Sequence, residues 1–269
     1  MLTLFLMPAI QAAIFMIPPR LLQTWKSKTD IPPHFRRWSA SFRRLNPQFE
    51  YELWDDSDNR QFIYKQFPWF AGIYNAYPAE IYRVDAMRYF YLYLYGGIYA
   101  DMDTECLKPL NDLTACSGVV LARMGQDNDF AHSIPNAIMA SSPRCEFWLF
   151  VISLMIQLSK QKLRPEYSTG PALLKTAVDR YLNHANQPDQ AIRLNIQRIS
   201  QRLNRQQIPL PGVNEIRILP PGVWYPVDWQ DKAHTALIRA ARNPDLPEQT
   251  TAVRFPDANM VTWWTHTWE

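Results

Sequence analysis

The stretch AEIYRVDAMRYFYLYLYGGIYADMD, residues 79–103, decides the fold of this 269-residue chain and points to its site. Up to residue 95 the apolar residues recur at helical intervals, and Gly96-Gly97 supplies a stop, so a helix is predicted over 79–95. Residues 98–103 then read as a strand. The segment is thus a predicted helix followed by a strand that ends in two carboxylates.

Asp101 and Asp103 are two residues apart on the predicted strand, so both carboxylates are expected on the same face. They also lie at its carboxyl end, where open α/β sheets bind their ligands. Carboxylate oxygens at such a place can hold Mg²⁺ or Mn²⁺, which in turn bridges a diphosphate. An Asp-x-Asp tripeptide alone is more often a solvated strand end. The surrounding residues must therefore decide whether these two carboxylates form a ligand site.

The preceding helix carries Asp85 and Arg88 three residues apart, which places them on one face. They can form a surface ion pair of a few tenths of a kcal/mol. Alternatively, Arg88 clamps a phosphate while Asp85 takes ribose hydroxyls. A glycosidase is disfavoured because an adjacent pair on one strand cannot flank a glycosidic bond, which requires carboxyl groups about 5–5.5 Å or more apart.

Outward from this segment, the pattern predicts an α/β fold. Strands are expected at 20–25 and 50–54 with a helix at 35–45 between them, a βαβ unit of a mostly parallel sheet. Asp55-Asp56 is interpreted as a turn or a helix N-cap rather than as part of the site. Further helices are predicted at 147–158, 172–182 and 190–207, and a strand at 215–219. No linker divides the chain, so residues 18–269 are expected to form a single domain.

Residues 1–17 carry no charge. They are too short for a spanning helix and lack the flanks of a secretory signal. A shortened or interfacial membrane anchor and a segment packed on the domain both remain open.

Composition excludes some function classes. Lys and Arg total 28 against 25 Asp and Glu, and this balance argues against the broad basic field that a nucleic-acid partner requires. The 3 cysteines are too few and too irregularly spaced for a disulfide framework or a zinc site, so they are expected to be buried small hydrophobes. Two features stay open: a sugar platform or core role for Trp224, Tyr225 and Trp229, and a lipid-binding or merely solvated face at Arg198, Arg202 and Arg205.

Residues 83–104 resemble the signature of the DXD sugar transferases of glycosyltransferase family 32, with the fungal initiation-specific α-1,6-mannosyltransferases as the nearest subgroup. Weaker blocks on both sides of this segment occur in the same order as in the family, so the resemblance runs from about residue 17 to 268. These blocks are Ile17-Pro18, Gln23-Thr24-Trp25-Lys26, Asn46-Pro47, residues 51–56, Asn136, Thr169-Gly170-Pro171 and His266-Thr267-Trp268.

The resemblance implies a GT-A fold, with a Rossmann-like nucleotide-binding half and a mixed sheet. It implies an enzyme that uses Mn²⁺ or Mg²⁺ and moves a hexose, mannose favoured, with retention of configuration. The donor would be GDP-mannose or a UDP-hexose, and the acceptor a glycan, glycolipid or glycoprotein. In a eukaryote it implies association with membranes of the Golgi or secretory pathway. In another organism the location would be cytoplasmic or is not determined by the resemblance.

Site residues follow from the same resemblance. Asp103 is expected to ligate the metal directly, and Asp101 to contact ribose and assist the metal. Asp85 and Asp103 are the expected catalytic carboxylates, with Asp85 also contacting ribose and sugar. The remaining expected contacts are a base stack on Trp25, a donor clamp at Arg88, a phosphate or ribose contact at Tyr99, donor contacts at Gly170 and Trp268, and a metal ligand at His266. Thr267-Trp268 departs from the family's usual Ser-Trp but keeps the hydroxyl.

Two other functions are compatible with the same core. One is a catalytically weak protein that binds nucleotide or glycan, and the other is a toxin-like enzyme that glycosylates proteins. The retained carboxylates and Arg88 favour an active transferase.

Overall fold

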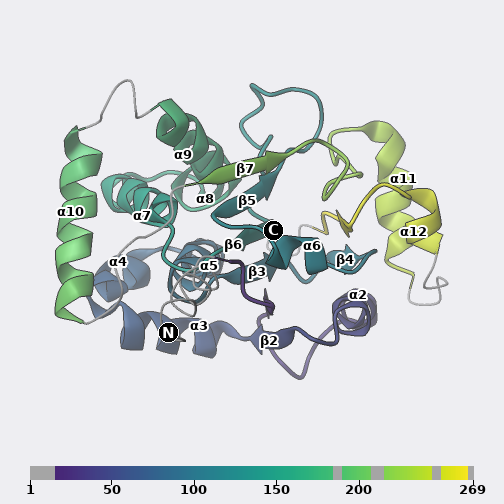
Figure 1. The fold of residues 1–269 in the computed structure, drawn as a ribbon, viewed down its shortest axis with the longest axis horizontal. Coiled ribbons are helices and arrows are strands. Elements are labelled where there is room, and N and C mark those ends of the chain that lie inside the picture. Colours follow the sequence, from purple (N-terminus) through teal and green to yellow (C-terminus); the bar gives the residue numbers. More distant parts are fainter. Residues whose placement is uncertain (1–15, 184–189, 207–214, 244–249, 266–269) are drawn as a thin grey trace, which may run out of the picture.

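The structure is a computed structural model that describes residues 16–183, 190–206, 215–243 and 250–265 (Figure 1). Its N-terminal part contains β1 (Arg20–Thr24), α2 (Pro33–Leu45), β2 (Glu50–Trp54), α3 (Asp56–Gln66), η1 (Pro68–Phe70), α4 (Ala71–Ala76), α5 (Glu80–Tyr95) and β3 (Gly97–Ala100). Then follow β4 (Thr104–Cys106), α6 (Asn111–Thr114), β5 (Val119–Ala122), β6 (Ile138–Ser141), α7 (Glu146–Leu158), α8 (Pro165–Ser168) and α9 (Pro171–Asn183). The last elements are α10 (Gln190–Arg205), β7 (Ile216–Leu219), α11 (Lys232–Ala241), α12 (Thr250–Arg254) and β8 (Met260–Thr262).

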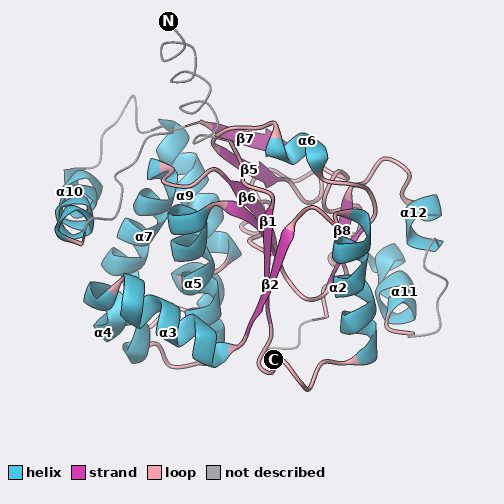
Figure 2. Cartoon of the chain, turned by 60° about the horizontal axis from the view of Figure 1, so that its bottom comes forward, coloured by secondary structure: helices cyan, strands magenta, loops and turns pink. Residues whose placement is uncertain are grey.

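A six-stranded mixed sheet of order β2-β1-β3-β6-β5-β7 forms the centre of the molecule. β1 is parallel to both β2 and β3, which confirms the predicted βαβ opening. β6 is antiparallel to β3 and β5, so the sheet is less parallel than expected. Helices cover both faces, with α3, α4, α5, α7 and α9 on one side and α2, α11 and α12 on the other (Figure 2).

Helix α5 lies deep in the helical layer against α7 and α3. Residues 85–93 are all buried, and this part of the helix is apolar or aromatic around most of its circumference because other elements surround it. At its end Gly96 and Gly97 adopt φ values of 65° and 94°, which favour glycine. A Cβ at Gly97 would lie 2.6 Å from the carbonyl oxygen of Arg20, so this glycine lets β3 pair closely with β1.

The predicted strand over 98–103 is wrong at its end. β3 stops at Ala100, and residues 101–103 form a turn in which the Thr104 N–H donates to the Asp101 carbonyl at 3.0 Å. The chain leaves the six-stranded sheet here because β4 pairs instead with β8 in a separate two-stranded sheet, with Thr104 opposite Thr262. The two carboxylates therefore project from a turn rather than from one face of a strand.

Three features outside the centre of the fold were also considered in the sequence. Cys106 and Cys145 are buried free thiols, whereas Cys116 is partly exposed. On α10, Arg198, Arg202 and Arg205 are all exposed, and Arg202 also lies over the ring of Trp69 at 5.4 Å, so a solvated face and a lipid-binding face both remain open. Residues 1–15 lie outside the described part, and the segment that follows is anchored because Ile17 donates its N–H to Cys116. Within the described ranges, none of the helices has the length and apolar character needed to cross a bilayer.

Candidate functional site

A cavity of about 700 Å³ opens at the carboxyl ends of the parallel strands β1, β2 and β3. Thr24 and Trp25 line it at the end of β1, Asp56 after β2, and Asp101 and Asp103 after β3. This is the edge of the sheet at which the sequence predicted a ligand. Asp56 was expected outside the site, and only Asp55 acts as the expected cap, accepting from the Ser57 and Asp58 N–H groups at the start of α3.

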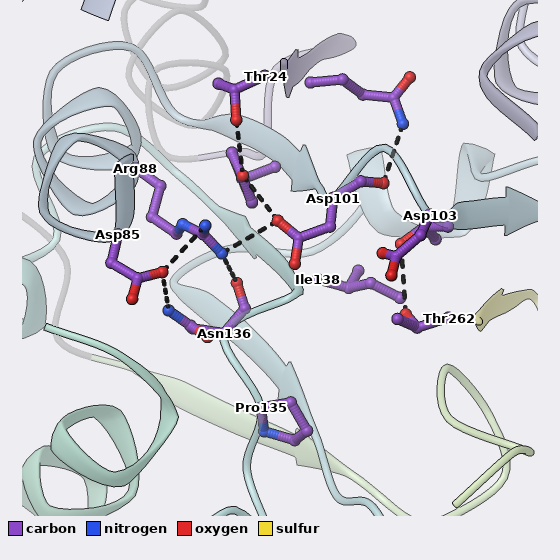
Figure 3. A network of polar contacts seen from close by, with 12 residues as sticks. Thr24, Asp85, Arg88, Asp101, Asp103, Pro135, Asn136, Ile138 and Thr262 are labelled. Atoms are coloured by element: carbon purple, nitrogen blue, oxygen red, sulfur yellow. Dashed lines mark hydrogen bonds and ion pairs between the residues drawn. The ribbon is translucent and has the colours of Figure 1, made fainter. Parts of the chain in front are cut away.

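Arg88 is the centre of a buried ion network (Figure 3). Its guanidinium lies 3.0 Å from Asp85 and 3.2 Å from Asp101, and it donates to the Asn136 carbonyl at 2.7 Å. It also lies over the Tyr99 ring, 4.3 Å from the centroid. Arg88 is only 3% exposed, so the surface-pair interpretation is wrong: Asp85 and Arg88 share a face of α5, and that face points inward.

Asp85 is held from two sides. Asn136 donates an amide N–H to it at 2.9 Å, and Gly170 lies behind it, because a Cβ at residue 170 would stand 3.1 Å from Oδ2. Burial raises the pKa of Asp85 to about 6, although Arg88 and Asn136 both favour the charged form. Gly170 itself does not line the cavity, whereas Pro171 does.

Asp101 is positioned by Tyr99. The Tyr99 hydroxyl donates to Asp101 Oδ1 at 2.8 Å and shares a 3.1 Å hydrogen bond with Thr24. Tyr99 is fully buried and absent from the cavity wall, so its expected contact with phosphate or ribose does not match its place beneath the site. Burial raises the pKa of Asp101, while Arg88 and Tyr99 act to lower it.

Asp103 is fixed by a residue that sequence reasoning missed. The backbone N–H and the hydroxyl of Thr265 donate to Asp103 Oδ2 at 2.8 and 2.9 Å. Burial raises the pKa of Asp103, and these bonds counteract it. The only signal was the hydroxyl-rich end of the chain, which the sequence interpretation assigned to residues 266–268. Those residues, including His266 and Trp268, lie outside the described part.

The carboxylates of the turn suit a divalent cation. In each, the protein holds one oxygen, which leaves Asp101 Oδ2 and Asp103 Oδ1 without a hydrogen bond to another described residue. No group of three or more acidic, histidine or cysteine ligands occurs among the described residues. Mg²⁺ is commonly bound by one or two carboxylates together with substrate phosphates and water, and two carboxylates are what this turn offers.

Trp25 lines the cavity. Its indole is partly exposed, donates to the Asp30 carbonyl at 2.8 Å and meets the Phe35 ring edge-on at 4.7 Å. The site thus has an aromatic surface beside its charged centre, and the base stack on Trp25 stays a prediction. By contrast, Trp224 and Tyr225 belong to the core, where the Ile138 N–H donates to the Tyr225 hydroxyl.

Comparison with known proteins shows what the segment around this site is similar to. Residues 32–119 match the model of the glycosyltransferase sugar-binding region containing the DXD motif, a range that includes Asp85, Arg88, Asp101 and Asp103. This segment therefore matches the sugar-binding region of DXD glycosyltransferases, the resemblance that the central block predicts.

Three curated fungal proteins show which relatives it resembles. Inositol phosphoceramide mannosyltransferase 3 of Schizosaccharomyces pombe is 36% identical over 169 residues, 59% of this chain and 44% of that protein. A mannosyl phosphorylinositol ceramide synthase of Saccharomyces cerevisiae is 33% identical over 172 residues, 62% and 43% respectively. The initiation-specific α-1,6-mannosyltransferase of the same yeast is 36% identical over 105 residues, 35% and 21%. The chain spans less than half the length of these relatives.

A solved structure supports the fold. The PaToxG glycosyltransferase superposes with a TM-score of 0.52 at 17% identity, covering 78% of this chain and 86% of that one. The predicted GT-A fold is confirmed.

Proposed function

We propose that this chain is a metal-dependent retaining glycosyltransferase that moves mannose from a nucleotide-diphospho-sugar to a glycolipid. The observation that carries the proposal is the buried Asp85–Arg88–Asp101 network with Asp103 beside it, at the carboxyl ends of three parallel strands. It lies within the segment that matches a sugar-binding region.

Charge balance supports the metal. When ionised, Asp85, Asp101 and Asp103 bring three negative charges, and Arg88 supplies one positive charge, so the network has a net charge of about −2. Asp101 and Asp103 are partly exposed to the cavity, where Mn²⁺ or Mg²⁺ would neutralise this clustered negative charge. Asp101 and Asp103 would hold the ion, which when bound neutralises charge that develops on the departing nucleoside diphosphate.

The chain's own residues would orient the donor. Thr265 and Tyr99 fix the two carboxylates of the turn before any ligand arrives, which is the preorganisation that electrostatic catalysis needs. Asp85 lines the cavity and offers a carboxylate to a sugar hydroxyl or to positive charge at the anomeric carbon. Arg88 already contacts two carboxylates, so we assign it to holding them rather than to clamping the donor.

The donor and the acceptor are inferred from the relatives. One of them is named an inositol phosphoceramide mannosyltransferase and another a mannosyl phosphorylinositol ceramide synthase, which favours GDP-mannose over UDP-hexoses and a glycolipid over a protein acceptor. Action on such a lipid would place the protein at a membrane surface, in a Golgi compartment of a eukaryotic cell.

A donor panel tests this proposal. The purified chain is heated with Mn²⁺ and GDP-mannose, GDP, UDP-glucose or UDP-galactose, since a ligand of the folded state raises the unfolding midpoint. We expect the guanosine compounds to raise it, and slow hydrolysis of GDP-mannose that Asp103→Ala abolishes. Equal hydrolysis by wild type and variant across all donors would contradict the assignment.

A further inference from the structure

One wall of the cavity consists of His132, Glu166 and Trp229, and the proposed donor site uses none of these residues. They come from three separate segments: the loop between β5 and β6, helix α8, and the loop that follows β7. The fold thus brings them to one place although the sequence does not.

The aromatic part of this wall is a cluster of three rings. Phe130, His132 and Trp229 lie with ring centroids 5.2 to 6.1 Å apart, and Trp229 is partly exposed where it lines the cavity. Burial lowers the pKa of His132, Arg164 lowers it further, and Glu166 opposes both. The imidazole is therefore mostly neutral at pH 7, and the wall presents uncharged ring surface to the cavity.

The polar part of the wall is Glu166. Its side chain is 12% exposed, and its Oε1 accepts a hydrogen bond from Arg164 at 2.7 Å. The second oxygen, Oε2, is buried and has no hydrogen-bond partner in the described part of the chain. A buried carboxylate oxygen without a partner is costly, and rotation of the Glu166 side chain, which lines the cavity, would offer this oxygen to a ligand hydroxyl.

The chain segments at Thr24 and Pro135 reach the ion network from different sides. Figure 3 shows Thr24 and Pro135 on opposite sides of the row formed by Asp85, Arg88 and Asp101. Trp25 directly follows Thr24, whereas His132 belongs to the loop that contains Pro135. A donor whose base lies near Trp25 and whose diphosphate lies near Asp101 would direct its sugar toward this wall.

On the basis of the proposed function, we propose that His132, Glu166 and Trp229 form the acceptor subsite, which binds one polyhydroxylated six-membered ring. The Trp229 indole stacks on the C–H face of the ring, and Glu166 Oε2 accepts one ring hydroxyl. Small-molecule sites commonly combine apolar aromatic walls with a few placed polar groups, and this wall has that composition. A cyclitol and a hexose share this chemistry, and the test below separates them.

The test is ligand-observed saturation-transfer NMR on the full chain with diamagnetic Mg²⁺ and the nucleoside diphosphate it binds, GDP or UDP. The probes are myo-inositol and methyl α-mannopyranoside. We expect wild type to transfer saturation to at least one probe, with tenfold or greater weakening in Trp229→Ala and Glu166→Gln. Matched controls outside the cavity are Trp69→Ala, a tryptophan beneath Arg202, and Glu146→Gln, whose partner is Tyr181. Both controls should bind the probes as wild type does.

The outcomes of this experiment separate the acceptor subsite from the alternatives. Equal probe binding by wild type, Trp229→Ala and Glu166→Gln, or no probe binding by wild type, overturns the acceptor subsite. Loss of nucleotide affinity together with probe binding would assign the wall to the donor instead. If Trp229→Ala lowers the thermal midpoint strongly, the near-isosteric Glu166→Gln decides alone. Failure of wild type to bind any nucleotide would contradict the proposed function. Probe binding is measured as a separate signal, so it tests the acceptor subsite independently.

Discussion

Replacing Arg88 with methionine should destabilise the protein in a pH-dependent way. Arg88 is buried between Asp85 and Asp101, 3.0 and 3.2 Å away. Methionine keeps much of the side-chain length over Tyr99 but leaves both carboxylates without their counter-charge. Removing one partner of a buried ion pair typically costs about 3–5 kcal/mol, and we expect the free energy of unfolding to fall by that amount at about pH 7.5.

The pH dependence comes from Asp85 and Asp101. Burial raises the pKa of each carboxyl in the folded protein to about 6 even though Arg88 lowers it, so without Arg88 both pKa values must rise further. A carboxyl whose pKa is higher in the folded than in the unfolded chain loses stability as pH rises, until the folded carboxyl ionises too. In wild type the decrease in the free energy of unfolding with rising pH ends near pH 6. In the variant it continues toward pH 7.5 at about 1.4 kcal/mol per pH unit for each carboxyl, so the penalty should be at least about 2 kcal/mol smaller at about pH 6 than at about pH 7.5.

Urea unfolding in EDTA at about pH 6 and at about pH 7.5 measures the free energy of unfolding that Arg88→Met removes. Unfolding is followed by tryptophan fluorescence and circular dichroism. The control is Arg60→Met, because Arg60 is half exposed and pairs with Glu80 at 3.5 Å. Exposed pairs contribute about 0–1 kcal/mol, so the control should change little at either pH. A penalty for Arg88→Met no larger than that of the control, or one that is equal at both pH values, would refute the reasoning.

Two further substitutions probe the two sides of the site. Trp25→Ala should weaken nucleotide binding more than it lowers the thermal midpoint, because the indole is partly exposed where it lines the cavity; a large stability loss with unchanged binding would instead make Trp25 a core residue. Tyr99→Phe removes the hydroxyl that joins Thr24 to Asp101 and should cost about 1 kcal/mol of stability. It should also raise the Mn²⁺ concentration needed for half-maximal donor hydrolysis, with Tyr64→Phe, an exposed tyrosine bonded to Asn75, as the control. An unchanged Mn²⁺ requirement would mean that Tyr99 does not position Asp101.

The parts of the fold that the sequence predicts well are those set by local patterns. Helix α5 and its glycine stop follow from periodicity and from the left-handed conformations at Gly96 and Gly97. Strand β2 matches its predicted range because it is bounded by turn residues. The position of the site at the carboxyl edge of the sheet follows from the same parallel pairing.

The parts that could not be predicted depend on contacts between distant segments. The turn at 101–103 arises because β4 pairs with β8, more than 150 residues later along the chain, and no local pattern shows that pairing. The same pairing brings Thr265 to Asp103. Arg88 is buried because other elements pack around α5. The spacing of Asp85 and Arg88 along the helix is the same for a surface ion pair and for a buried network, so the sequence could not distinguish them. The cavity wall with Trp229 is likewise visible only in three dimensions.

The most direct test of the central claim is mannosyl transfer itself. Wild type, Asp103→Asn and the control Asp179→Asn, an exposed residue of α9, are incubated with GDP-[¹⁴C]mannose and inositol phosphoceramide in detergent, with Mn²⁺ or with EDTA. We predict labelled lipid from wild type and from the control only with Mn²⁺, and a loss of at least a hundredfold in Asp103→Asn. Transfer that persists in EDTA, or that is equal in wild type and Asp103→Asn, would contradict a metal site at Asp101 and Asp103. No transfer by wild type to any glycolipid from either GDP-mannose or a UDP-hexose would contradict the proposed function.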